Sequence, residues 1–76
     1  MQREEKSERS RRAVLDAALH LFSHRGFRAT TVREIADRAK VSTGNLYHHF
    51  PDKDAIFRAL IEEYSAITET PAFPFT

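Results

Sequence analysis

The chain has 76 residues, a formal net charge of +1 and no cysteine. This length allows one small domain, and the lack of cysteine excludes a disulfide framework and a thiolate metal site. No apolar run approaches the length that crosses a membrane and no signal-peptide pattern opens the chain, so we expect a soluble, cytoplasmic protein.

The charges are unevenly distributed along the chain. Residues 1–12 carry five Lys/Arg and three Glu, and residues 13–58 carry seven Lys/Arg and five Asp/Glu. Residues 59–76 carry three Glu and no basic residue. This asymmetry permits an anionic partner for the first part of the chain, although an ordinary solvated surface gives similar counts.

The first predicted helix follows a polar segment. Residues 1–10, MQREEKSERS, are interpreted as a flexible polar arm. A helix over about 11–25 is then predicted by apolar residues at three- and four-residue spacing, namely Val14, Leu15, Ala18, Leu21 and Phe22. Gly26 suits the left-handed position just past a helix end, and Phe27 is placed to pack back on Phe22.

The second and third predicted helices each begin at a capping residue. Thr31 and Glu34 have the spacing of a capping box, which starts a helix over about 32–39. Ser42 is a good N-cap for a helix over about 43–50, and Pro51 ends that helix. Val41 and Leu46 around this cap have the spacing of a hydrophobic staple.

A fourth helix is predicted over about 53–68, capped by Asp52. Its apolar stripe is wide and consists of Ile56, Phe57, Leu60, Ile61, Tyr64 and Ile67. Residues 69–76 contain two prolines and no helical period, so an irregular tail is expected. The fold class is therefore all-α, and two short helices joined by a three-residue turn indicate a helix-turn-helix.

The free face of the third helix distinguishes this chain from a small helical bundle with no binding role. Leu46 and Phe50 are four residues apart and can both face the core. The remaining positions are small, polar or aromatic: Thr43, Gly44, Asn45, Tyr47, His48 and His49. A solvated helix favours Glu, Lys and Ala, and glycine costs roughly 1 kcal/mol against alanine in a helix interior. Close approach of the backbone to DNA would explain Gly44.

The same residue types suit DNA recognition. Ser, Thr, Tyr and Lys donate to phosphate oxygens, and an Asn side chain pairs with an adenine edge through two hydrogen bonds. Lys53 is mismatched with the dipole at the start of the fourth helix unless a phosphate lies there. The alternative is an ordinary solvated lysine, since this misplacement costs only a few tenths of a kcal/mol.

Residues 11–60 resemble the DNA-binding domain of the tetracycline-repressor (TetR) family of bacterial transcriptional regulators. The resemblance is carried by Ala17-Ala18, Leu21-Phe22, Gly26-Phe27, Thr30 to Ala36, Ala39, Val41-Ser42, Gly44, Leu46 to Phe50, Lys53 and Phe57. It implies a three-helix, homeodomain-like helix-turn-helix bundle followed by the start of a fourth linking helix. It also implies that the third helix enters the major groove.

The resemblance further implies a set of DNA-binding residues and partners. The DNA-binding positions are Thr31, Ser42, Thr43, Gly44, Asn45, Tyr47, His48, His49 and Lys53. Of these, Lys53 and Thr31 match positions that contact phosphates in the family. His49 matches a position that contacts DNA in some members and packs against the protein in others. The partner is an operator in double-stranded DNA, and repression is the expected effect. Full-length members add a C-terminal domain, absent from this sequence, that forms homodimers and binds a small-molecule inducer.

Two features depart from the family pattern. Lys40 occupies a turn position where the family usually has glycine, so left-handed geometry there would cost about 1 kcal/mol. Without the C-terminal domain, Phe57, Ile61 and Tyr64 are expected to be partly exposed. This exposure motivates an alternative, in which the chain is a truncated interaction module that pairs through the fourth helix with a full-length relative.

Other constellations predict little. His20 and His24 share a helical face, but they lack a third ligand and the Glu of a metalloprotease motif. Ser42 and the neighbouring histidines lack an orienting carboxylate, so no enzymatic activity, cofactor or metal is expected. Arg9, Arg11 and Arg12 are as consistent with phosphate or minor-groove contacts as with a solvated arm.

Overall fold

The structure is a computed structural model that describes the backbone of residues 2–68 and the side chains of residues 7–63. Four helices follow one another: α1 (Gln2–Arg25), α2 (Val32–Ala39), α3 (Thr43–His49) and α4 (Lys53–Thr68). The described residues contain no strand, which confirms the all-α prediction. None of these helices combines the length and the apolarity needed to cross a membrane. The irregular tail predicted for 69–76 lies outside the described residues.

Helix α1 begins nine residues earlier than the apolar spacing predicts, at position 2 rather than 11. Residues 2–10 therefore continue the helix and do not form a separate arm. The reason is compositional, because Gln, Arg, Glu and Lys have high helix propensities and dominate this segment. An apolar stripe indicates only the part of a helix that packs against a core. The polar residues 2–10 carry no such stripe, so the spacing of apolar residues did not predict this part of α1.

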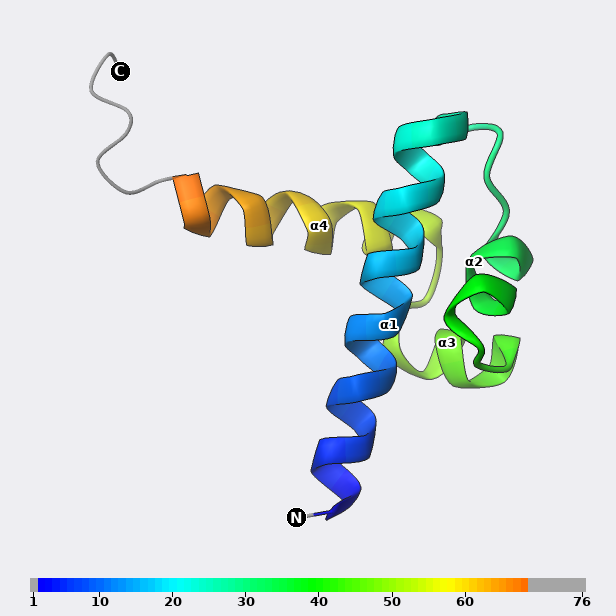
Figure 1. Cartoon of the computed structure of the whole chain (residues 1–76), viewed down its shortest axis with the longest axis vertical. Helices are drawn as coiled ribbons and strands as arrows, with labels where there is room; N and C mark the ends of the chain where they lie inside the picture. The colour runs from blue at the N-terminus through cyan, green and yellow to red at the C-terminus, as the bar shows by residue number, and fades with distance from the viewer. Residues whose placement is uncertain (1, 69–76) are drawn as a thin grey trace.

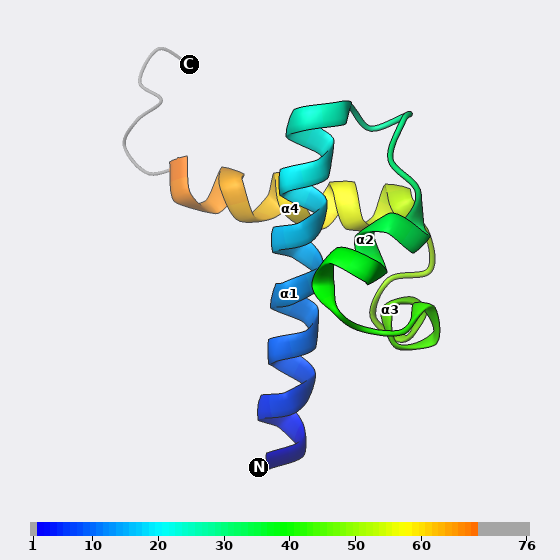
Figure 2. The same ribbon diagram turned by 45° about the vertical axis from the view of Figure 1, so that its right-hand side comes forward.

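The arrangement places α2 and α3 beside α1, while α4 crosses α1 (Figure 1). The rotated view in Figure 2 shows the same crossing, with α2 and α3 together next to α1. A bidentate pair joins the crossing helices, since Arg12 Nη2 donates to both carboxylate oxygens of Glu63 at 3.0 and 3.2 Å. Both side chains are partly exposed, so this pair contributes at most about 1 kcal/mol.

One hydrophobic core lies where the helices meet. Its buried residues come from all four helices and from Phe50, the residue that follows α3: Val14, Leu15, Ala17, Ala18, Ile35, Ala36, Leu46, Phe50, Ile56 and Leu60. Leu46 is fully buried and Phe50 is 5% exposed. The two apolar positions of α3 are thus both used for packing, as their four-residue spacing predicts.

Left-handed residues end α1 and α2. Gly26 has φ +93° and its amide donates to Phe22 O at 2.9 Å, while the Phe22 and Phe27 ring centroids are 5.2 Å apart. Lys40 has φ 63° and ψ 41°, and its amide donates to the carbonyls that end α2. The predicted helix end at Gly26 is confirmed, and Lys40 adopts the left-handed geometry for which strain of about 1 kcal/mol is expected.

Candidate nucleic-acid interface

Helix α3 is held at its start by Ser42, whose Oγ accepts a hydrogen bond from the Asn45 amide at 2.9 Å. Its free face is exposed at five of the six predicted contact positions: Thr43, Gly44, Asn45, Tyr47 and His48. The Tyr47 side chain is half exposed, at 50%. This face is therefore open to a partner, while the opposite face is fixed to the core through Leu46.

His49 is the partly buried member of the set. Burial lowers the pKa of His49, and the neighbouring positive charges of His48 and Arg11 lower it further. Phe50 follows His49 in the chain, and the Arg11 guanidinium lies 5.6 Å from the centroid of the Phe50 ring. His49 is thus at the boundary between the packed and free faces of α3.

Nothing within the fold requires glycine at position 44. A Cβ built on Gly44 would have one neighbour within 4 Å, the Ser42 Oγ at 3.9 Å, which is an ordinary contact. Its backbone dihedral angles do not lie in the left-handed region either. The cost of glycine in a helix is therefore not offset by any close packing inside the described chain.

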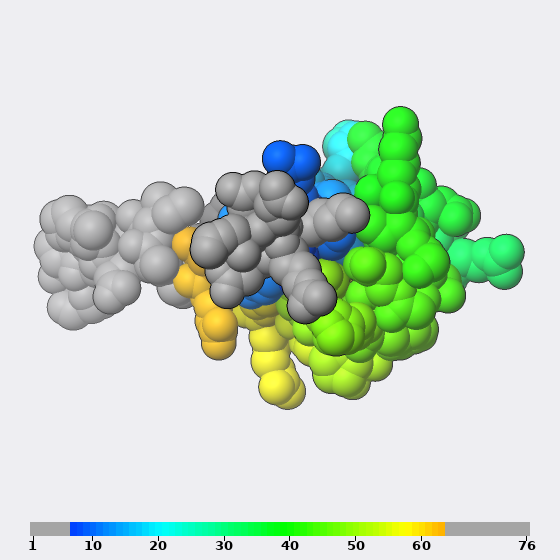
Figure 3. Space-filling view, turned by 90° about the horizontal axis from the view of Figure 1, so that it is seen from below, coloured from blue at the N-terminus to red at the C-terminus, as the bar shows by residue number. Residues whose placement is uncertain are grey.

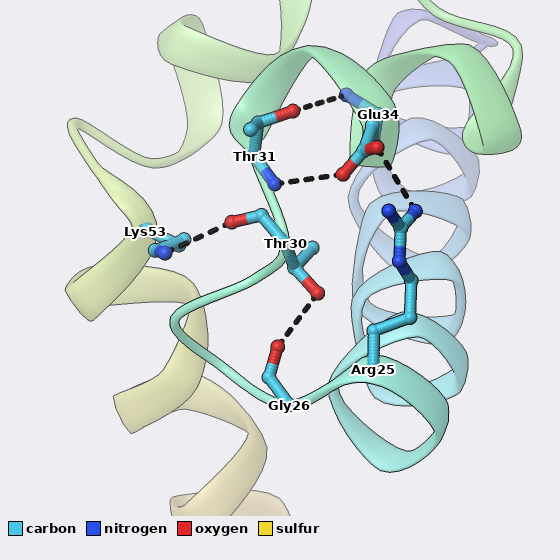
Figure 4. Close-up of polar contacts among 6 residues, drawn as sticks. All are labelled: Arg25, Gly26, Thr30, Thr31, Glu34 and Lys53. Atoms are coloured by element: carbon cyan, nitrogen blue, oxygen red, sulfur yellow. Dashed lines mark hydrogen bonds and ion pairs between the residues drawn. The ribbon is translucent and has the colours of Figure 1, made fainter.

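The start of α2 is fixed by a reciprocal pair of hydrogen bonds, drawn in Figure 4. The Glu34 amide donates to Thr31 Oγ1 at 3.1 Å, and the Thr31 amide donates to Glu34 Oε1 at 3.0 Å. Arg25 Nη1 donates to the other Glu34 oxygen at 2.9 Å. The bond from the Thr31 amide first, and then the bond and charge of Arg25, lower the pKa of the Glu34 carboxyl.

Lys53 does not point freely into solvent. Its Nζ donates to Phe27 O at 2.6 Å and to Thr30 O at 2.9 Å, and it lies 4.2 Å from the Phe27 ring centroid. The phosphate contact of Lys53 stays a prediction. The two carbonyl bonds were not predicted, because they join positions 26 and 23 residues apart and no local spacing indicates them.

Seen from the end at which α1 begins, the α2 and α3 region forms one continuous side of the molecule and α4 lies on another (Figure 3). Thr31 and Ser42 cap the starts of these two helices. The structure thus brings together the predicted residues of α3 and its cap. It gives Lys53, at the start of α4, partners in the α1–α2 turn instead.

The remaining candidates form no site in the described residues. The His20 and His24 rings stack with centroids 4.1 Å apart, and no group of three His, Asp or Glu side chains among residues 7–63 is placed to hold a metal ion. Phe57 is 42% and Ile61 48% exposed on α4, as expected for that stripe. The side chain of Tyr64 lies outside the described ones.

Comparison with known proteins assigns the family. The model of the family described as "Bacterial regulatory proteins, tetR family" matches residues 14–60. The chain belongs to the tetR family. No solved structure matches it.

Several curated tetR-family relatives share this region. The chain is 46% identical over 54 residues to the HTH-type transcriptional repressor KstR2 of Rhodococcus jostii, which covers 71% of this chain and 26% of the relative. It is 45% identical over 51 residues to the repressor of the same name from Mycobacterium tuberculosis, covering 67% and 26%. It is 40% identical over 58 residues to the A-factor receptor protein of Streptomyces griseus, covering 76% and 21%. The chain thus spans about a quarter of the length of these relatives.

Proposed function

We propose that this chain binds double-stranded DNA in a sequence-specific manner, as the DNA-binding part of a transcriptional regulator that acts as a repressor. The observation that carries the proposal is the division of α3 into two faces. Leu46 is fully buried, whereas Asn45 and Tyr47 on either side of it are exposed. A seven-residue helix is unstable alone, so this packing is what presents its polar face as a fixed surface.

The exposed residues supply two kinds of contact. Asn45 offers an amide to an adenine edge in the major groove, with Thr43, His48 and His49 as further base or backbone contacts. Phosphate contacts are proposed for the hydroxyls of Tyr47, Ser42 and Thr31 and for the ammonium of Lys53.

Gly44 supports the same assignment. A Cβ at this position would make one ordinary contact, at 3.9 Å from Ser42 Oγ, so packing within the described residues does not require glycine there. We propose that the α3 backbone approaches the DNA surface closely at this position. The proposal involves no chemical step and no cofactor.

The family and the half-site spacing of operators support a proposal about assembly. Operators of helix-turn-helix dimers place two half-sites about 34–36 Å apart. We propose a homodimer for a full-length protein, and an inducer-binding role for any C-terminal domain of it. A cytoplasmic location fits this function. The names of the curated relatives are those of repressors, regulators and a receptor, and they lend no support to the pairing module through α4.

The experiment that tests the function is selection of duplexes from a random pool by the 76-residue chain, followed by equilibrium binding at several salt concentrations. We expect a recurring sequence to be enriched, with an affinity that falls steeply as salt rises. Tyr47→Phe should weaken binding to all duplexes alike because it removes a phosphate contact. Tyr64→Phe makes the same change on α4 and should have no effect. Enrichment of no sequence would contradict the proposal.

A further inference from the structure

The Arg11 side chain of α1 lies at the end of α3. Both ribbon views place α3 beside the first half of α1 (Figure 1 and Figure 2). The Arg11 guanidinium is over the ring of Phe50, 5.6 Å from its centroid, and Phe50 is the residue that follows α3. The ring is 5% exposed and therefore a fixed support. Its attraction for the cation is electrostatic and occupies none of the N–H donors of the guanidinium.

A row of side chains leads from Arg11 to the exposed face of α3. The ring centroids of Phe50 and His49 are 6.3 Å apart, and those of His49 and His48 are 5.5 Å apart. His48 is exposed and is one of the proposed contact positions. Burial first, then His48 and then the charge of Arg11 lower the pKa of His49, so the guanidinium acts on this row. Arg11 thus borders the surface that α3 presents.

The structure separates Arg11 from Arg12, which the sequence leaves equivalent. Arg12 Nη2 donates to both carboxylate oxygens of Glu63, at 3.0 and 3.2 Å. Arg11 Nη1 is 3.7 Å from Glu63 Oε2, which is too long for a hydrogen bond. The Arg11 side chain is 45% exposed. A single carboxylate faces these two guanidiniums, so positive charge is left beside the end of α3.

We propose that Arg11 is a further phosphate ligand of the DNA interface, contributed by α1 at the edge of the α3 surface. It neutralises a phosphate of the strand that borders the groove while α3 faces the bases. A guanidinium suits this role because its planar fork of donors matches a phosphate through two parallel hydrogen bonds. The proposal rests on the proposed function, because it requires α3 to lie on DNA.

The salt dependence of duplex binding measures this contact. Each phosphate that a cation neutralises adds about 0.9 to the slope of log K against log salt. Arg11→Met keeps an unbranched apolar stem and removes the charge. We expect it to bind the selected duplex several-fold more weakly at low salt, with a slope less steep by about 0.9. Arg11→Lys keeps the charge and should retain the slope.

Arg12→Met is the matched control, because it makes the same change of charge at the next residue. Its guanidinium is bonded to Glu63, so we expect the slope to stay unchanged and the midpoint of urea unfolding to fall. Arg11→Gln is the second variant if Arg11→Met does not fold, with the same criteria.

The results that overturn this contact are distinct from those that overturn the proposed function. An unchanged slope in Arg11→Met overturns the Arg11 contact alone. Equal losses of slope in Arg11→Met and Arg12→Met also overturn it, since they report net charge and not one contact. Binding without enrichment of any sequence contradicts the proposed function, and the slope is then measured on any duplex. A chain that binds no duplex overturns both.

Discussion

Thr31 and Glu34 satisfy each other's backbone amides, at 3.1 Å through the Thr31 hydroxyl and at 3.0 Å through the Glu34 carboxylate. The first four amides of a helix have no partner within it, so side chains that accept from them determine where the helix begins. Here the pair starts α2 at Val32, directly beside the turn that Lys53 holds.

Thr31→Ala should lower the free energy of unfolding by about 1 kcal/mol, because it removes the oxygen that accepts from the Glu34 amide. Thr31→Ser keeps that oxygen and is the control, with a smaller change expected. Urea unfolding measures both. Equal stabilities of the alanine and serine variants would mean that the cap contributes nothing.

Glu34 predicts a loss of stability in acid. Its pKa is lowered in the folded chain by the bond from the Thr31 amide first and by Arg25. The stabilisation is thus fully present above the ordinary carboxyl pKa of the unfolded chain, and it is lost as the pH falls through the lower folded pKa. Compared with the unchanged chain, Glu34→Gln should be less stable near neutral pH and should lose less stability between pH 5 and pH 2. Thermal unfolding at each pH measures both chains. A pH dependence identical to that of the unchanged chain would contradict this assignment.

The left-handed Lys40 predicts a stabilising substitution. A non-glycine residue in the left-handed region costs roughly 1–2 kcal/mol, which glycine avoids. Glycine also loses more backbone entropy on folding, and this loss offsets part of the stabilisation. Lys40→Gly should therefore raise the free energy of unfolding by about 0.5–1 kcal/mol. Arg33→Gly, at an exposed position inside α2, should lower it by a similar amount. A destabilised Lys40→Gly would show that the lysine has a compensating contact.

A substitution at Gly44 should change stability and DNA binding in opposite directions. Alanine meets no clash in the fold and has a higher helix propensity, so Gly44→Ala should stabilise the chain by up to about 1 kcal/mol. The same methyl group should weaken binding to the selected duplex if the backbone approaches DNA closely. Unfolding and duplex titration are compared on one preparation. A Gly44→Ala chain that is more stable and binds the selected duplex equally well would contradict a close approach of the backbone to DNA at this position.

Local spacing was enough to predict much of the fold. The capping box at Thr31, the cap at Ser42, the glycine ending at Gly26 and the burial of Leu46 all follow from residues within four positions of one another. Each is confirmed, since a helix start or end is decided by its nearest neighbours.

The features that sequence reasoning missed have a different physical origin. The early start of α1 lies in a polar segment with no apolar stripe, so helix propensity alone extends it. The bonds of Lys53 to Phe27 and Thr30 form only when the helices are packed, so no local spacing indicates them. The phosphate contact of Lys53 stays a prediction. Five of the six predicted contact positions of α3 are exposed and His49 is partly buried, but exposure does not reveal which base a residue would read.

Base reading by α3 can be measured with Asn45→Ala against duplexes that differ from the selected sequence by one base pair. Asn45 is exposed and its substitution should leave stability nearly unchanged. We expect the variant to lose discrimination between base pairs at one position, worth about 1–3 kcal/mol, and to keep it at the others. An equal loss of affinity for every duplex would contradict base reading by this helix.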